Sequence, residues 1–382
     1  MKVLVVAGAR PNFMKVAPIL AALRGAGHEA VLVHTGQHYD AGMSDAFFAD
    51  LGMAPPEHHL EVGSGSQAEQ TARVMERFDP VLLAVRPDWV VVVGDVNSTL
   101  AAALVTAKRR SEIGVRLAHV EAGLRSGDWA MPEEVNRVLT DQLADLLLIH
   151  SPEATDHLAH EGIPSHRVVF VGNVMMDALF DVRERAAGDH PWAALGLEQE
   201  RYGLLTLHRP SNVDTAAALA PLLEGLGVVA RELPLVWPMH PRARGALTRH
   251  GLQVPAGIEV IEPVGYRAMT AWLAGAAMVV TDSGGLQEES TALGVPCVTL
   301  RESTERPITV TEGTNRMVPW PPDARGIHAA VVAAREAGRR PGSRDTGRPE
   351  GWDGRAAERI VAALEAAPLA DARSPIPARV PG

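Results

Sequence analysis

Residues 89–99 read Trp-Val-Val-Val-Val-Gly-Asp-Val-Asn-Ser-Thr, an apolar run that passes straight into a polar turn containing glycine. The run is apolar at every position instead of every second one, which is typical of a parallel strand covered on both faces. Similar runs occur at 2–7, 29–35, 115–120, 146–150 and 168–171. Segments of helical periodicity lie between them, at 67–85, 98–109, 133–144 and 153–160. The alternation predicts an α/β lobe with a doubly wound parallel sheet.

A second series of apolar runs predicts a second lobe of the same kind, with strands at 202–207, 235–239, 258–261, 278–281 and 297–300. We place the junction near 174–185, so that the lobes span 1–177 and 178–352. A last helical stretch at 355–366 follows a polar linker. The final residues, 368–382, are rich in proline and poor in apolar side chains, and we expect them to be loose.

Composition and charge exclude several classes of protein. The chain has 382 residues, and 36 lysines and arginines against 46 aspartates and glutamates give a net charge of −10. Since nucleic-acid and anionic-membrane surfaces need a basic face, we expect no partner of either kind. The single cysteine, Cys297, excludes an intramolecular disulfide and fits a reducing compartment. No apolar stretch resembles a signal peptide or a membrane helix, so we expect a cytoplasmic protein.

The clearest ligand-binding pattern in the second lobe is Thr-Asp-Ser-Gly-Gly-Leu-Gln-Glu-Glu at 281–289. A buried strand here delivers Ser283, Gly284 and Gly285 to the start of a helix, where free N–H groups and the helix dipole favour an anion such as a diphosphate. Glu289, one turn later, is placed to accept hydrogen bonds from ribose hydroxyls. The alternative is an ordinary helix capped by Ser283.

The first lobe offers a matching cationic turn, Gly8-Ala9-Arg10-Pro11-Asn12, with Lys15 on the following helix. Arg10 at a strand end is a candidate phosphate clamp and Lys15 a second cation, although surface ion pairing is the usual role of an arginine. In the second lobe, His208-Arg209 and His240 also follow strands. All three are candidates for substrate binding or catalysis, with a structural histidine as the alternative. The histidines lack the two- or three-ligand spacing of a zinc site, and we expect no metal.

Three carboxylates at expected strand or helix ends suit proton transfer. Asp95 ends the run at 89–94, Glu121 follows Leu-Ala-His-Val, and Glu133 opens a helix after Pro132. Burying an acid costs several kcal/mol unless it is paired or used, so acids at these loops favour general acid–base work. For Glu133, a first-turn carboxylate that stabilises its helix is an equal alternative.

Motifs spread from Gly8 to Arg316 together resemble one family, the non-hydrolysing UDP-N-acetylglucosamine 2-epimerases. The matching stretches, in the family's order, are GARPNFMKVAPI, HTGQHYD, GDVNSTLA, HVEAGLRSGD, MPEEVNRVLTD, VGNVMMDAL, TLHRPSNVD, TDSGGLQEES and RESTERPITVTEGTNR. The resemblance implies a GT-B-like fold, in which two Rossmann-like lobes close a cleft on a UDP-sugar. It also implies a homodimer and a helix at 353–367 that packs back on the first lobe.

The resemblance also assigns roles by motif. The residues that match catalytic positions are Asp95, Glu121, Glu133 and His208. Those that match contacts to diphosphate, ribose and phosphate are Ser283, Gly284, Gly285, Glu289, Arg10 and Arg306. The implied reaction interconverts UDP-GlcNAc and UDP-ManNAc by eliminating UDP to a 2-acetamidoglucal and adding it back, without a cofactor. We hypothesise that Asp95 and Glu133 exchange the C2 proton, Glu121 supports an oxocarbenium-like stage and His208 assists the phosphate.

Other functions fit part of the pattern. A 2-epimerase of a modified UDP-sugar, such as a 2,3-diacetamido uronate, shares most of these motifs, and Val264 and Met269 depart from better-known members in the uracil-contact region. A GT-B glycosyltransferase uses the same lobes but needs an acceptor, while the acids of the first lobe favour proton chemistry on the donor. A hydrolysing epimerase and a non-catalytic sensor are further alternatives.

Overall fold

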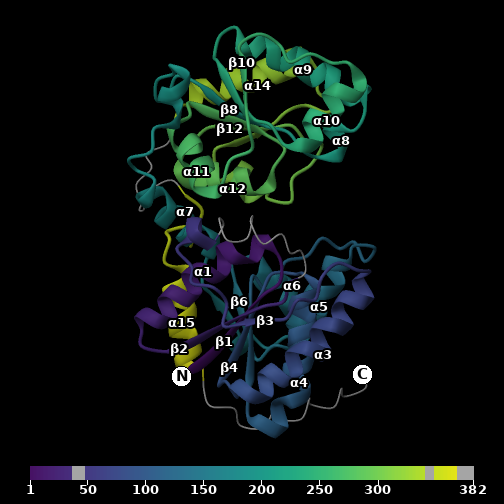
Figure 1. Cartoon of the computed structure of the whole chain (residues 1–382), viewed down its shortest axis with the longest axis vertical. Helices are drawn as coiled ribbons and strands as arrows, with labels where there is room; N and C mark the ends of the chain where they lie inside the picture. Colours follow the sequence, from purple (N-terminus) through teal and green to yellow (C-terminus); the bar gives the residue numbers. More distant parts are fainter. Residues whose placement is uncertain (37–47, 340–347, 368–382) are drawn as a thin grey trace. The chain divides into compact units, whose positions relative to one another are not determined.

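The computed structural model describes residues 1–36, 48–339 and 348–367. The chain divides into two compact units, which we call unit 1 (Met1–Asp177 with the segment from Arg355 onward) and unit 2 (Ala178–Gly354). Each unit contains its own all-parallel sheet (Figure 1). No helix in the described part of the chain is long and apolar enough to cross a membrane.

Unit 1 has a seven-stranded sheet in the order β3-β2-β1-β4-β5-β6-β7. Helix α1 contacts β1 and β2, whereas α3, α4 and α5 pack in a row on the other side of the sheet (Figure 1). The strands are β1 (Lys2–Ala7), β2 (Glu29–His34), β3 (His58–His59), β4 (Trp89–Val93), β5 (Arg116–Val120), β6 (Leu146–Ile149) and β7 (Val168–Phe170). The helices are α1 (Arg10–Gly25), α3 (Gln67–Val85), α4 (Asn97–Ile113), α5 (Pro132–Leu143), α6 (Ala154–His160) and α15 (Ala356–Ala366), with the start of α7 (Val174–Arg185), which continues into unit 2.

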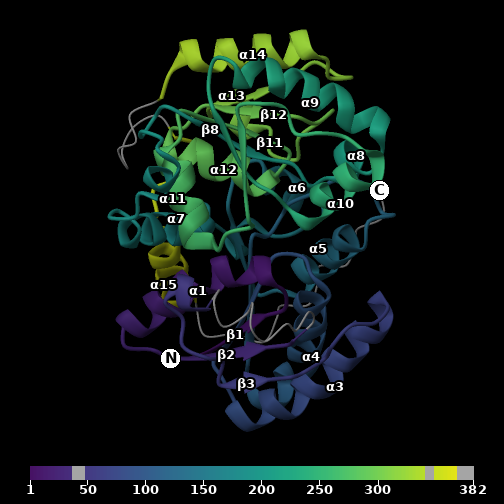
Figure 2. The same cartoon turned by 45° about the horizontal axis from the view of Figure 1, so that its top comes forward.

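Unit 2 has a six-stranded sheet in the order β10-β9-β8-β11-β12-β13. Helices α9 and α14 lie side by side on it (Figure 2). The strands are β8 (Gly203–Thr206), β9 (Leu235–Pro238), β10 (Ile258–Ile261), β11 (Met278–Thr281), β12 (Cys297–Thr299) and β13 (Asn315–Met317). The helices are α8 (Pro210–Val213), α9 (Ala216–Ala230), α10 (Pro241–His250), α11 (Tyr266–Gly275), α12 (Gly284–Leu293), α13 (Ile308–Thr311) and α14 (Ala324–Ala337).

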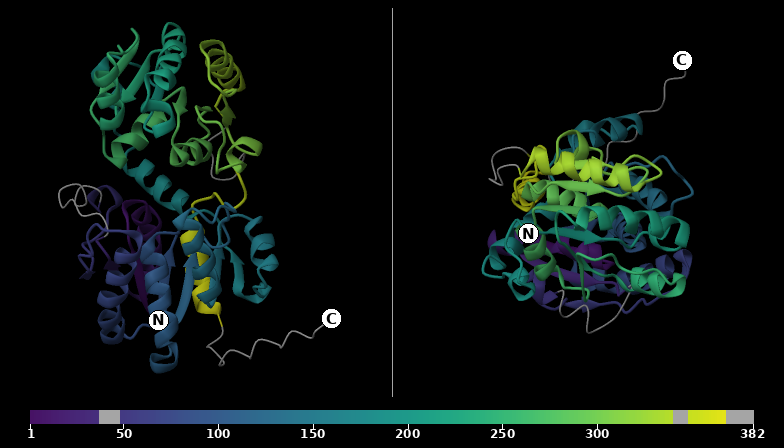
Figure 3. Two further views of the ribbon diagram at one scale, coloured as in Figure 1. Left: turned by 90° about the vertical axis from the view of Figure 1, so that its right-hand side faces the viewer. Right: turned by 90° about the horizontal axis from the view of Figure 1, so that it is seen from above.

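Helix α15 joins the C-terminal part of the chain to unit 1, where it packs beside α1 (Figures 1 and 3). Its first N–H groups, those of Ala356 and Ala357, donate to the Asp177 carboxylate at 3.2 and 2.8 Å. A negative charge at a helix N-terminus satisfies free donors and the helix dipole. At the other end of the helix, Glu365 pairs with His28 at 2.8 Å.

The two parallel α/β sheets confirm the fold expected from the apolar runs. Two short edge strands, β3 and β13, were not predicted because His58–His59 and Asn315–Met317 lack an apolar run. The expected junction at 174–185 is one continuous helix, α7, and the boundary between the units falls inside it. The expected loose tail at 368–382 and most of the polar linker lie outside the described residues.

Candidate active site

Several candidate residues lie after the strands at the two points where the strand order reverses. In unit 1 the reversal falls between β1 and β4, and in unit 2 between β8 and β11. Open α/β sheets bind ligands beyond the carboxyl ends of the strands at such points. Asp95 and Lys15 belong to the first point, and His208 and Ser283 to the second. The topology therefore gathers residues that are far apart in the sequence.

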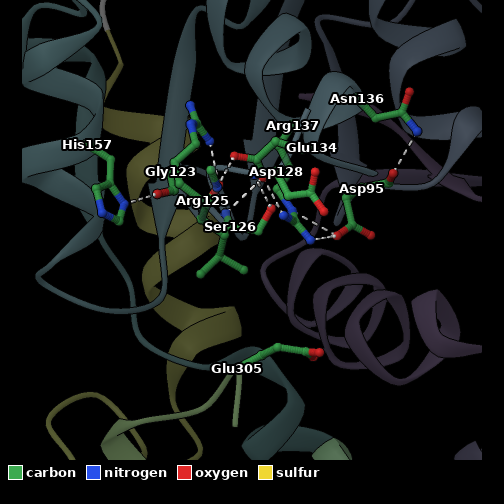
Figure 4. A network of polar contacts seen from close by, with 12 residues as sticks. Asp95, Gly123, Arg125, Ser126, Asp128, Glu134, Asn136, Arg137, His157 and Glu305 are labelled. Carbon is green, nitrogen blue, oxygen red and sulfur yellow. Dashed lines mark hydrogen bonds and ion pairs between the residues drawn. The ribbon is translucent and has the colours of Figure 1, made fainter. Parts of the chain in front are cut away.

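Asp95 is held by an arginine from helix α5. Its Oδ2 atom accepts hydrogen bonds from Nε and Nη2 of Arg137 at 3.0 and 2.8 Å (Figure 4). Asn136, the preceding residue on α5, donates to the backbone carbonyl of Asp95 at 2.8 Å. A carboxylate with two charge-assisted donors on one oxygen is fixed in direction, and its second oxygen stays available.

Arg137 is in turn anchored by Glu134, which is 2% exposed. The Glu134 carboxylate accepts from Arg137 Nη1 at 2.6 Å and from the N–H groups of Ser126 and Gly127 at 2.9–3.0 Å. Burial alone would raise the pKa of Glu134, but these donors together hold it below its usual range. Glu134 is thus a structural carboxylate that ties the loop after β5 to helix α5.

Glu121 pairs with Lys15, and both side chains are largely buried. Glu121 has a φ of 70°, in the left-handed region that a side chain other than glycine rarely adopts. Such strained residues concentrate at functional sites, where the surrounding structure holds them in place. Lys15, which the sequence predicts as a substrate contact, is the counter-ion of this acid in the described structure.

Glu133 occupies the first turn of α5 and is half-buried. Among the described residues its side chain makes no hydrogen bond or ion pair, unlike Asp95 and Glu121. The three candidate acids therefore differ in environment: one is held by an arginine, one by a lysine, and one has no protein partner in the described part of the chain.

A buried ion pair supports the two loops that carry Asp95 and Glu121. His119, which is fully buried, contacts Asp141 Oδ1 through Nδ1 at 2.6 Å and the Gly94 carbonyl through Nε2 at 2.8 Å. Asp141 also accepts from the Gly123 N–H at 3.0 Å and from Arg125 at 2.7 Å. Burial alone would raise the pKa of Asp141, but His119 and Arg125 hold it below its usual range.

Arg10 is the first residue of α1, and its side chain lies outside what the structure describes. The turn that carries it is fixed by Asn12, whose Oδ1 accepts from the N–H groups of Gly8 and Ala9 at 3.1 and 2.9 Å. Asn12 Nδ2 donates to the Val93 carbonyl at 3.2 Å. This link joins the ends of β1 and β4, the neighbouring strands at the reversal point.

In unit 2, Asp282 organises the turn after β8. The carboxylate is fully buried and accepts the His208 Nδ1 contact at 2.9 Å and the Arg209 N–H at 2.9 Å. His240, at the N-terminus of α10, lies with its ring centroid 5.9 Å from that of His208. Arg209 has a buried Nε atom with no partner among the described residues. Buried donors of this kind are usually satisfied by water or a ligand.

Ser283, Gly284 and Gly285 start helix α12 as the sequence predicts, with Ser283 at the cap position. The Ser283 side chain makes no capping bond, so the capped-helix alternative lacks its defining contact. A Cβ added at Gly284 would meet nothing within 4 Å, and one at Gly285 only Ser283 Oγ at 3.9 Å. The packing of the protein does not require glycine here, which leaves close approach of a ligand as a reason for it.

Glu289 on α12 is 6% exposed, with the Tyr266 hydroxyl beside it. Burial and the neighbouring Glu288 raise the pKa of Glu289 to about 8. Glu288 itself pairs with Arg306 Nε at 3.2 Å. The expected phosphate contact Arg306 is therefore partly neutralised within unit 2.

Several partners of these residues were not assigned by the sequence. Arg137, Asp282 and Arg301 sit within recognised motifs but received no role. Arg301 contacts Glu305 at 3.0 Å and keeps a buried Nη1 atom without a partner among the described residues. The spacing of Glu134 and Arg137, three residues apart on a helix, was the one available signal. Within the described residues, no three His, Cys, Asp or Glu side chains are grouped to hold a metal ion.

Comparison with known proteins gives the context for this geometry. The family model for UDP-N-acetylglucosamine 2-epimerase matches residues 21–365. The UDP-2,3-diacetamido-2,3-dideoxy-D-glucuronate 2-epimerase of Pseudomonas aeruginosa is 41% identical over 323 residues, which are 83% of this chain and 88% of that protein. The UDP-N-acetylglucosamine 2-epimerase of Methanococcus maripaludis is 38% identical over 82% of this chain and 87% of its own length.

Solved structures agree with these matches. The UDP-GlcNAc 2-epimerase of Methanocaldococcus jannaschii superposes with a TM-score of 0.82 at 35% identity, over 95% of this chain and 99% of that one. A second structure of the Methanocaldococcus enzyme contains UDP-GlcNAc and UDP, with a TM-score of 0.76 at 36% identity and the same coverage. The GT-B-like fold class predicted from the motifs is confirmed.

Proposed function

This chain belongs to the UDP-N-acetylglucosamine 2-epimerase family and is a UDP-sugar 2-epimerase, and from that premise we propose that it interconverts UDP-GlcNAc and UDP-ManNAc. The observation that carries the proposal is the set of three acids in distinct environments that follow β4, follow β5 and open α5 in unit 1. Two of them are paired with cations, and Glu133 has no partner among the described residues.

The proposed reaction begins with an elimination. A carboxylate removes the proton from C2, the electron pair of the C2–H bond forms the C1–C2 double bond, and the C1–O bond breaks with its pair left on the departing phosphate. The products are 2-acetamidoglucal and UDP. Re-addition of UDP, with a proton delivered to the other face of C2, gives the epimer. Because C2 is not next to a carbonyl group, removing the proton without loss of UDP is unfavourable.

Two faces of C2 require two proton-handling groups, and we assign them to Asp95 and Glu133. Asp95 is aimed by Arg137 through one oxygen, which leaves the other oxygen for the substrate. The pair of Glu121 with Lys15 keeps a fixed carboxylate available to stabilise positive charge that develops at C1. The orienting contacts hold Asp95 and Glu121 in place before the substrate arrives, and such preorganisation favours catalysis.

Unit 2 supplies the groups that suit a nucleoside diphosphate. The N-terminus of α12 at Ser283, Gly284 and Gly285 offers N–H donors, and Arg209 contributes a guanidinium nitrogen, Nε, that has no partner within the described ranges. From their match to the family's motifs we assign Glu289 to the ribose and His208 to the departing phosphate. We assign further contacts to His240 and Arg306 of this unit and to Arg10 of unit 1.

A second substrate has a specific observation in its favour. The Pseudomonas relative, at 41% identity, acts on a 2,3-diacetamido uronate. Separate incubations with UDP-GlcNAc and with UDP-2,3-diacetamido-2,3-dideoxy-D-glucuronate distinguish the two, with the C2 epimers followed by NMR. We expect the larger kcat/KM for UDP-GlcNAc. Turnover of the uronate alone would replace the proposed substrate and leave the 2-epimerase assignment unchanged.

We also propose that the enzyme acts as a cytoplasmic homodimer that supplies an activated amino sugar to polysaccharide synthesis. The net charge of −10 and the single buried cysteine support a reducing, aqueous compartment. Sedimentation of the purified chain, with and without UDP, tests the dimer. A monomer under both conditions would contradict it.

A further inference from the structure

In the contact between Asp282 and His208, the carboxylate is the acceptor and the imidazole ring is the donor. The Asp282 carboxylate is fully buried and accepts the backbone N–H groups of His208 and Arg209 at 3.0 and 2.9 Å and the Asn212 amide at 3.1 Å. Burial alone would raise the pKa of Asp282, but the His208 side chain and the Arg209 N–H hold it below its usual range. An ionised carboxylate only accepts hydrogen bonds, so His208 Nδ1, at 2.9 Å, must be a donor.

The neighbouring histidine has the opposite arrangement. His240 Nδ1 accepts the Arg242 N–H at 3.1 Å, so a neutral His240 carries its proton on Nε2. Burial, His208 and Arg242 lower the pKa of His240, which favours that neutral form. The two rings, 5.9 Å apart, therefore have different tautomers. A neutral His240 can donate from Nε2, whereas Nε2 of His208, which has no partner among the described residues, can accept a hydrogen bond.

We propose that Asp282 is a positioning residue that locks His208 in the Nδ1–H tautomer and so presents Nε2 to the phosphate that departs from the sugar. The inference rests on the proposed function for its ligand, a nucleoside diphosphate, but the tautomer follows from unit 2 alone. The His208 side chain is 39% exposed, so Nε2 has a path to a ligand that the buried Asp282 lacks. Asp282 acts only through His208.

The arrangement also explains why an aspartate precedes the Ser-Gly-Gly turn. Asp282 directly follows β11, and His208 lies two residues after β8, its neighbour in the sheet. One carboxylate thus fixes the backbone after β8 and the histidine ring together. A short carboxylate at the strand end performs both tasks, because its two oxygens share four donors.

The test is Asp282→Asn in the full chain labelled with ¹⁵N-histidine. The amide donates toward Nδ1, so we expect the alkaline ¹⁵N spectrum of His208 to change from the Nδ1–H to the Nε2–H tautomer. The His208 signal is assigned by its loss in His208→Gln. We expect kcat to fall about 10²-fold or more, with KM changed by less than about 3-fold. Asn212→Ala, which removes another donor to Asp282, should leave the tautomer unchanged.

Each failure has its own meaning. An Nε2–H tautomer at His208 in the unmodified protein would overturn the inference. This measurement does not need the variant, so it decides the matter even if Asp282→Asn does not fold. So would a folded Asp282→Asn variant with the Nδ1–H tautomer and unchanged kcat. Absence of turnover of any UDP-sugar by the unmodified protein would instead contradict the proposed function, and the spectrum would still decide the tautomer.

Discussion

Gly94 offers a sharp test of the site in unit 1, because a single methyl group there meets the paired acid. Gly94 lies between β4 and Asp95 with a φ of +66°. An added Cβ would lie 3.2 Å from Lys15 Nζ, 3.3 Å from Glu121 Oε2 and 3.4 Å from Asn12 Nδ2. Gly94→Ala therefore strains the backbone and pushes on the Lys15–Glu121 pair at once.

The two effects have different magnitudes. The left-handed conformation costs an alanine about 1–2 kcal/mol of unfolding free energy. For a unit of this size that lowers Tm by about 2–4 °C per kcal/mol. The contacts at 3.2–3.4 Å require shifts of a few tenths of an ångström from the ends of side chains. Because stabilisation of charge at C1 by a fixed carboxylate is sensitive to such displacements, we expect kcat to fall about 10- to 100-fold.

Gly114→Ala is the matched control. Gly114 ends α4 with a φ of +71°, and a Cβ there meets nothing within 4 Å. Both variants should lose a similar amount of stability in thermal unfolding, but only Gly94→Ala should lose activity in an epimerisation assay. Equal activity in the two variants would refute the claim that the Lys15–Glu121 pair is part of the active site.

Three further outcomes are expected. Gly284→Ala and Gly285→Ala should leave Tm nearly unchanged, since a Cβ has space at both positions. Both should weaken UDP binding about 10-fold by calorimetry, because the added methyl group blocks approach to the N–H groups. An unchanged affinity for UDP would show that the diphosphate binds elsewhere. Burial raises the pKa of Glu289 from its ordinary value of 4.5 to about 8 in the folded protein. Between these pH values the folded state binds a proton that the unfolded state has lost. The free energy of unfolding therefore falls by up to about 4 kcal/mol as pH rises from about 5 to 8. Glu289→Gln should flatten that slope in Tm, and an unchanged slope would show that another group causes it. Arg137→Lys keeps the charge but loses the two-donor contact to Asp95. We expect kcat to fall about 10-fold or more while the Kd for UDP stays constant. A change in the Kd for UDP alone would indicate that Arg137 contacts the nucleotide.

The sequence predicted most accurately the bounds of strands that are buried along their whole length. Strands β1, β4 and β11 have the expected bounds because each is a buried, largely apolar run with a polar turn after it. β13, Asn315–Met317, was missed because it is a short polar edge strand held by one neighbour. Such strands have no period or composition that separates them from loops.

For the site, the sequence located the acids at the strand ends but not their partners. Lys15 and Arg306 were both expected at phosphate, and the structure pairs them with Glu121 and Glu288. A sequence shows which residues carry charge, whereas pairing depends on which loops the sheet order brings together. Asp282 illustrates this, because its role appears only once β8 and β11 are neighbours.

The most direct test of the central claim, that the C2 proton is removed and returned, is epimerisation of the sugar nucleotide in deuterated water, followed by NMR. We expect deuterium at C2 of the new epimer and, as the reaction reverses, of the starting sugar, with exchange strongly slowed in Asp95→Asn and Glu133→Gln. An epimer that keeps its original C2 hydrogen would contradict the account.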